Sequence, residues 1–170
     1  MGDSFTRGRV VAIALNDPRI PSRDAHPALA SARQIAAAAA LGYSGDLTPV
    51  DAWDVVRSGL ARLVDVRTAE ERRFVGHVPG SLHVPWATGV AMTRNPRFIR
   101  ELEDQVRRDE VVLLICRCGP RSVAAAIAAT QARFQHAYNV SEGFEGDLDA
   151  DGHRGAVGGW RFHGLPWQQD

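Results

Sequence analysis

The stretch Val111–Ala129, VVLLICRCGPRSVAAAIAA, organises the sequence. It starts with the apolar residues 111–115, continues through Cys116 into a short loop with two arginines, and ends in small residues that begin near Ser122. A continuous apolar run of this length before Gly-Pro is typical of a strand buried on both faces of a parallel sheet. The stretch therefore predicts a strand, a tight loop and a helix in direct succession.

The predicted loop gives Cys116 the surroundings of a reactive thiol. Parallel sheets bind their ligands at the C-terminal ends of the strands, and the first N–H groups of a helix are unpaired and attract anions. A free thiol titrates near ~8.5, and helix N-termini and nearby arginines lower that pKa to roughly 3.5–7.5. Because the thiolate is the nucleophile, we predict that Cys116 is catalytic, with an anionic substrate held by Arg117 and Arg121. The alternative is a small buried side chain that only ends the strand.

The loop CRCGPRS, from Cys116 to Ser122, resembles the active-site loop of the rhodanese sulfurtransferases. In that family the first cysteine carries a persulfide and the loop ends in arginine. Cysteine phosphatases have five residues between these two, whereas four separate Cys116 from Arg121, a tighter loop that suits a sulfur anion better than a phosphate. Cys118 departs from the pattern, because serine or another small polar residue is common there. Its thiol is either a spectator or a trap that converts the persulfide into a disulfide.

Further motifs extend the resemblance over roughly residues 43–167. They are DVR at Asp65–Arg67, GHVPG at Gly76–Gly80, VSEG at Val140–Gly143 and GLP at Gly164–Pro166. The resemblance implies an α/β fold, a rhodanese-like five-stranded parallel sheet with helices on both faces. It also implies that Asp65 and Arg67 support the loop as a buried ion pair.

Histidines and acidic residues could also act as a general base or as metal ligands, but their patterns support these roles less well. His77 could act as a general base, but the family pattern places it in a structural turn and a stable thiolate needs no base. No other histidine stands at ligand spacing from a cysteine, so we expect no metal. Asp147, Asp149 and Asp151 imitate the start of a calcium-binding loop, but the twelfth position is Gly158 instead of Glu. We expect a solvated acidic loop beside the active site.

Composition limits the broad class of protein. The chain has 170 residues and a formal net charge of +0, which predicts one domain and no general attraction to nucleic acid or membranes. Its two cysteines do not form a disulfide framework, so a cytoplasmic location is expected. The apolar run Val10–Leu15 is too short for a secretory signal. We divide the chain into residues 1–42, an N-terminal arm and alanine-rich helix, and residues 43–170, the rhodanese-like domain.

Local signals predict the remaining elements. The helix expected over 28–41 ends at Gly42 and has a thin apolar stripe of Leu29, Ile35 and Leu41. Further helices are expected after the caps Thr48, Thr68 and Asn95. The helix after Asn95 is expected to start at Pro96 and to run to about Arg108. One more helix is expected over 122–132. Strands are expected over 10–15, 61–66, 82–84, 111–115 and 137–140.

These observations predict a sulfurtransferase that needs no metal or organic cofactor. A thiosulfate-like donor would bind at the loop residues Arg117, Cys118, Gly119, Pro120, Arg121 and Ser122. Cys116 would take the outer sulfur, release sulfite and pass the sulfur to cyanide, a thiol or a partner protein. Mercaptopyruvate is the second choice of donor. The alternative is a redox or persulfide sensor or carrier that uses the Cys116/Cys118 pair.

Overall fold

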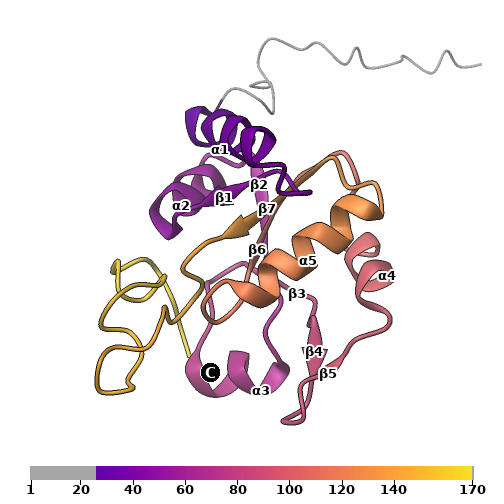
Figure 1. Ribbon diagram of the computed structural model, residues 1–170. Helices are drawn as coiled ribbons and strands as arrows, with labels where there is room; N and C mark the ends of the chain where they lie inside the picture. The colour runs from indigo at the N-terminus through magenta and orange to yellow at the C-terminus, as the bar shows by residue number, and fades with distance from the viewer. Residues whose placement is uncertain (1–25, 170) are drawn as a thin grey trace, which may run out of the picture.

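The computed structural model describes residues 26–169, which form a parallel sheet covered by helices on both faces (Figure 1). The strands are β1 (Asp46–Leu47), β2 (Ala61–Asp65), β3 (Leu82–His83), β6 (Val111–Ile115) and β7 (His136–Val140), in the order β1-β7-β6-β2-β3. The helices are α1 (Pro27–Ala39), α2 (Pro49–Arg57), α3 (Ala69–Val75), α4 (Phe98–Glu103) and α5 (Pro120–Gln131). The predicted α/β fold with a five-stranded parallel sheet is confirmed. The strand expected over 10–15 lies outside the described residues.

Strand β6 lies at the centre of the sheet, and all five of its side chains are buried. Successive side chains of a strand point to opposite faces. Val111, Leu113 and Ile115 therefore join the core on one face, and Val112 and Leu114 join the core on the other. Helices α1 and α2 cover the first face, and α4 and α5 cover the second (Figure 1).

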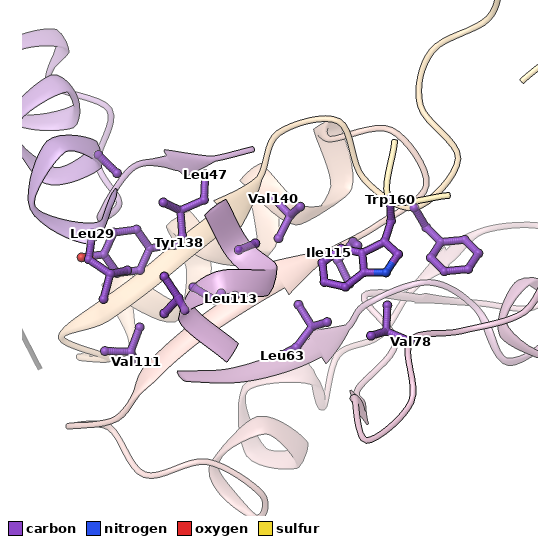
Figure 2. Close-up of a cluster of buried hydrophobic side chains, with 14 residues drawn as sticks. Leu29, Leu47, Leu63, Val78, Val111, Leu113, Ile115, Tyr138, Val140 and Trp160 are labelled. Atoms are coloured by element: carbon purple, nitrogen blue, oxygen red, sulfur yellow. The ribbon is translucent and has the colours of Figure 1, made fainter. Parts of the chain in front are cut away.

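The C-terminal segment completes the first of these two cores. Trp160 is fully buried there and meets Trp53 of α2 edge to face, with ring centroids 5.8 Å apart. Figure 2 shows Trp160 next to Ile115 at one end of the layer and Leu29 of α1 at the other. Residues after β7 are thus part of the domain core, and they pass beside the end of β6.

Two helix starts follow the predicted capping chemistry. The Thr48 side chain accepts a hydrogen bond from the Asp51 N–H, with Pro49 in the first turn of α2. The Thr68 side chain accepts from the Glu71 N–H, and the Glu71 carboxylate accepts from the Thr68 N–H, which is a complete capping box. The second cap fixes Glu71 at the N-terminus of α3.

The predicted boundaries and inward face of α1 need correction. The helix ends at Ala39, and Ala40 takes the left-handed conformation with φ 53°, so Gly42 is not the terminator. Ile35 is 64% exposed, and the buried side chains are Leu29, Ala32 and Ala36. Small alanines face inward because the chain approaches closely there: a Cβ on Gly45 would lie 2.4 Å from the Ala32 carbonyl oxygen.

The predicted α4 was too long at both ends. It begins at Phe98 because the Asn95 carboxamide serves the preceding turn, where it accepts from the Arg97 N–H and donates to the Pro85 carbonyl. It ends at Glu103, and the chain then turns toward β6 through a hydrogen bond from the Arg107 N–H to the Glu110 carboxylate. The last helix, α5, starts at Pro120, two residues earlier than predicted.

Of the two-residue strands in the described residues, β3 was predicted, within the strand expected over 82–84, and three others were not. Strand β1 has two residues, and so do β4 (Ala87–Thr88) and β5 (Thr93–Arg94), which pair as an antiparallel hairpin. Two residues are too few to show the alternation that identifies a strand. Within residues 26–169, none of the helices combines the length and apolar character that a membrane span requires.

The central strand yields a first test of the fold. We expect Leu113→Ala to lower the free energy of unfolding by about 2–5 kcal/mol, because Leu113 is fully buried in β6 and its loss leaves a cavity. Leu148→Ala is the matched control, since Leu148 is 54% exposed. Urea unfolding at pH 7 measures both variants, and equal losses in the two would contradict the assigned core.

Candidate active site

Cys116 follows β6 directly and is 1% exposed. Its sulfur accepts a hydrogen bond from the Gly119 N–H at 3.1 Å and contacts the Ser122 hydroxyl at 3.2 Å. Since α5 begins at Pro120, the N–H groups of Arg121 and Ser122 belong to its first turn, where backbone donors have no partner in the helix. The predicted loop thus wraps around the Cys116 sulfur and brings a helix N-terminus beside it.

The Ser122 hydroxyl has two acceptors within reach and one proton to donate. The buried Ser122 Oγ lies 2.8 Å from the Gly119 carbonyl oxygen and 3.2 Å from the Cys116 sulfur. A hydroxyl rotates to suit its surroundings. Ser122 can therefore donate to the carbonyl when Cys116 is a thiol, and to the sulfur when Cys116 is a thiolate.

Two glycines give the loop its tight shape. Gly119 has φ 115°, and a Cβ there would lie 2.6 Å from the Ser141 carbonyl oxygen. Gly143 has φ 65°, and its Cβ would lie 2.6 Å from backbone atoms of Arg117 and Cys118. The chain after β7 therefore packs directly against the backbone of the cysteine loop.

Backbone hydrogen bonds hold these two segments together. The Phe144 N–H donates to the Cys116 carbonyl at 2.8 Å, and the Glu145 N–H donates to the Arg117 carbonyl at 2.9 Å. With the carbonyls of the first loop residues occupied on that side, the loop N–H groups are free to turn toward the sulfur. The position of Cys116 thus depends on the chain that follows β7.

Arg121 has a partner in the protein that the sequence did not suggest. Its two terminal nitrogens each donate to Glu71 of α3 at 2.7 Å, and both side chains are 18% exposed. The hydrogen bond to Glu71, opposed by burial, raises the pKa of Arg121, and the nearby charges of Cys116 and Cys118 add to the increase. The guanidinium thus connects the loop to α3, and substrate binding by Arg121 stays a prediction.

Glu71 is the residue at this site that the sequence reasoning missed. It was treated only as half of a capping box, although the same carboxylate also receives Arg121, fifty residues along the chain. Burial favours the neutral acid, but the hydrogen bonds from Arg121 and the Thr68 N–H outweigh it and lower the pKa of Glu71. The sequence held no local signal for this second partner, because Arg121 lies fifty residues away along the chain.

Arg117 and Cys118 are accessible residues of the loop, as are Pro120 and, in part, Arg121. The Arg117 side chain is exposed, and among residues 26–169 no hydrogen bond or ion pair to it is found. Cys118 is partly exposed, and both cysteines are free thiols. Arg117 is therefore a cation of the loop that is open to solvent.

Asp65 and Arg67 form the buried ion pair expected from the sequence. The Asp65 carboxylate accepts from the Arg67 N–H at 3.0 Å and from its Nη2 at 2.7 Å, with both side chains at most 2% exposed. The same nitrogen donates to the Gly76 carbonyl at 2.7 Å, and the guanidinium lies 4.0 Å from the centroid of the Phe144 ring. Because the Phe144 N–H donates to the Cys116 carbonyl, the pair is linked to the loop through one residue. Its supporting role remains a prediction.

The other polar candidates lie in structural positions. His77 forms an antiparallel bridge with Gln168, with backbone hydrogen bonds in both directions. In the acidic loop, one Asp149 carboxylate oxygen accepts from the N–H groups of Asp151 and His153. These contacts stabilise turns near the C-terminus.

The family comparison agrees with this geometry. The rhodanese-like domain family matches residues 48–150, from the cap of α2 to the acidic loop. The chain belongs to this family. The family resemblance inferred from the cysteine loop is therefore confirmed.

Individual relatives support the same assignment. The crystal structure of Rv0390 from M. tuberculosis has 47% sequence identity and a TM-score of 0.69, covering 75% of this chain and 99% of that one. Thiosulfate sulfurtransferase 16, chloroplastic, of Arabidopsis thaliana is 31% identical over 68% of this chain and 85% of its own length. The uncharacterized protein RP600 homolog of Rickettsia rickettsii is 34% identical over 64% of this chain and 83% of its own length.

The close approach at Gly143 yields a prediction for this rhodanese-like domain. Both Gly143→Ala and its control Gly152→Ala place alanine at positive φ, which costs roughly 1–2 kcal/mol of stability in each. Only at Gly143 does the new Cβ collide with the cysteine loop, whereas Gly152 faces open space. We expect Gly143→Ala alone to slow iodoacetamide alkylation of Cys116 about tenfold, because the donors around the thiolate are displaced. Equal alkylation rates in the two variants would refute the coupling.

The Glu71–Arg121 pair yields a second prediction. We expect Glu71→Gln to lower the free energy of unfolding by about 1–3 kcal/mol at pH 7, because it leaves a half-buried guanidinium poorly paired. Glu71 has a lowered pKa in the folded protein, so its contribution is present above the unfolded pKa and is lost as the pH falls through the folded value, below 4.5. The difference between variant and wild type should therefore shrink in acid.

The neighbouring Glu70→Gln is the control for this experiment, because Glu70 is exposed in the same turn of α3. Urea unfolding between pH 7 and pH 3 measures both variants. A Glu71→Gln deficit that is constant over this range would contradict the assignment of the stabilising charge to Glu71.

Proposed function

We propose that this protein is a sulfurtransferase that moves sulfane sulfur from thiosulfate to a thiophilic acceptor through a persulfide on Cys116. One observation carries the proposal: the Cys116 sulfur accepts the Gly119 N–H and lies beside the Ser122 hydroxyl at the N-terminus of α5. Such donors stabilise a thiolate before the reaction and a persulfide anion after it. Membership of the rhodanese-like family supports the same chemistry.

The proposed reaction has two exchange steps. The Cys116 thiolate attacks the outer sulfur of thiosulfate, the sulfur–sulfur bond of the donor breaks, and sulfite leaves with the bonding electrons. The product is a Cys116 persulfide anion. A nucleophilic acceptor then attacks its outer sulfur and regenerates the Cys116 thiolate. Both steps are displacements at sulfur, which require no metal or organic cofactor.

Arg117 is the residue that we assign to the sulfonate end of the donor. Thiosulfate carries two negative charges, and Arg121 is already paired with Glu71. Arg117 is exposed at the same loop and can approach the donor from solvent. The N–H groups of the α5 N-terminus supply the remaining positive potential.

The proposal extends to the surroundings of the reaction. A thiolate nucleophile and a second free thiol suit a reducing compartment, so we infer a cytoplasmic location. The partners are a small sulfur donor and an acceptor, which is a thiol or a protein in the cell and cyanide in an assay. Neither a nucleic acid nor a membrane takes part in this chemistry.

Intact-protein mass measurement tests the proposal. After incubation with thiosulfate, we expect wild-type protein to gain one sulfur atom, which cyanide then removes. Cys116→Ser should gain none, because the attacking thiolate is gone. Sulfate in place of thiosulfate is the control, since it has a similar charge and no sulfane sulfur. A wild-type mass that thiosulfate leaves unchanged would rule out thiosulfate as the donor.

A further inference from the structure

The two thiols of the active-site loop differ in their access to solvent. Cys116 is 1% exposed and its sulfur lies against Gly119 and Ser122, whereas Cys118 is partly exposed. A small acceptor such as cyanide needs little room to reach a buried sulfur, but a thiol carried on a peptide or a protein brings much more bulk. The site thus holds its nucleophile deep and a second thiol nearer to the surface.

Covalent geometry keeps the two thiols close. The Gly119 nitrogen lies 3.1 Å from the Cys116 sulfur and is bonded to the carbonyl carbon of Cys118. The Cys118 Cα therefore lies within about 6 Å of the Cys116 sulfur. A persulfide adds one sulfur–sulfur bond of about 2 Å to the reach of Cys116. The distance between the Cys118 Cα and the Cys116 sulfur is thus within the combined reach of a persulfide and a cysteine side chain, and the relay requires the Cys118 side chain to turn toward it.

We propose that Cys118 is a second catalytic residue, which takes the sulfur from the Cys116 persulfide and presents it to thiol acceptors. This inference rests on the proposed function, because it needs the Cys116 persulfide to form. It assigns a role to the residue that departs from the family pattern in the loop.

The transfer balances without an oxidant. The Cys118 thiol first gives its proton to the outer sulfur of the Cys116 persulfide anion. The resulting Cys118 thiolate attacks that outer sulfur, and a bond forms between the two sulfur atoms. The bond from that sulfur to Cys116 breaks, and Cys116 leaves as a thiolate. The proton stays on the sulfur that moves, so the product is a Cys118 persulfide. An acceptor thiolate then attacks this outer sulfur and leaves with it, which restores the Cys118 thiolate.

A relay agrees better with the loop than a disulfide between the same cysteines does. A disulfide needs the two sulfur atoms about 2.05 Å apart, in a ring closed across a single residue, and such strained bonds are labile. It would also pull Cys116 away from the Gly119 N–H. In the relay the moving atom lies between two sulfurs that stay farther apart, so the loop keeps its shape.

The test compares how loaded protein loses its sulfur to a small acceptor and to a larger thiol. Wild type, Cys118→Ser and Cys118→Ala are incubated with thiosulfate, freed of excess donor, and mixed with cyanide or with glutathione. Intact mass follows the loss of the sulfur with time. The cyanide rate of each protein is the reference for its own glutathione rate, because a substitution in the loop can change both. We expect the ratio of the glutathione rate to the cyanide rate to be about tenfold lower in both variants than in wild type, because the variants lack the intramolecular acceptor.

Each outcome has a distinct meaning. Glutathione discharge at the wild-type rate in both variants would overturn the relay and leave the sulfurtransferase proposal intact. A loaded wild type that loses hydrosulfide and becomes two hydrogens lighter than the reduced protein would replace the relay with a disulfide. If wild type gains no sulfur, the proposed function fails and the relay with it. Peptide mapping after alkylation of loaded wild type should find the extra sulfur on Cys118 as well as on Cys116.

Discussion

The hydrogen bond from the Gly119 N–H to the Cys116 sulfur is the contact on which the site depends. To make it, the chain must reverse within three residues of the end of β6, and Gly119 adopts φ 115° to do so. The reversal leaves no room for a side chain, because Ser141 presses against Gly119 from the adjoining segment. That segment is there because β7 pairs in parallel with β6, so both strands end at the same edge. Sheet register thus determines the geometry of the sulfur.

The neighbouring strands support the loop by different means. On one side, the segment after β7 supplies backbone hydrogen bonds from Phe144 and Glu145. On the other, the segment after β2 supplies the buried Asp65–Arg67 pair, whose guanidinium lies over the Phe144 ring. A buried pair is costly to form and costlier to break, because removal of one partner leaves an unpaired charge. If the pair supports the loop as predicted, its contribution is to favour one arrangement of this edge more than to add to the free energy of unfolding.

The sequence predicted the features that local chemistry encodes. Five consecutive apolar residues identified β6, and the threonine caps identified the starts of α2 and α3. It failed where a side chain had a second, distant partner. Asn95 has the chemistry of a helix cap, but it serves the turn to Pro85. Arg121 suggested an anion site, and only the folded chain brings Glu71 to it. Such pairings depend on tertiary structure, which spacing along the chain does not record.

The burial of Cys116 protects a persulfide on its sulfur but limits the access of acceptors to it. A sulfur at 1% exposure, with buried donors around it, is protected from water and from bulky reductants, so a persulfide there can persist. The same depth restricts the acceptors that can remove the sulfur. A more open site would admit larger acceptors, but it would remove hydrogen-bond donors such as the Gly119 N–H and the Ser122 hydroxyl from the sulfur. A second thiol at the rim solves the problem differently, because the bond that must be reached moves outward while the first thiol keeps its donors. Cys118 occupies that position, and its cost is one partly exposed cysteine that only a reducing environment protects.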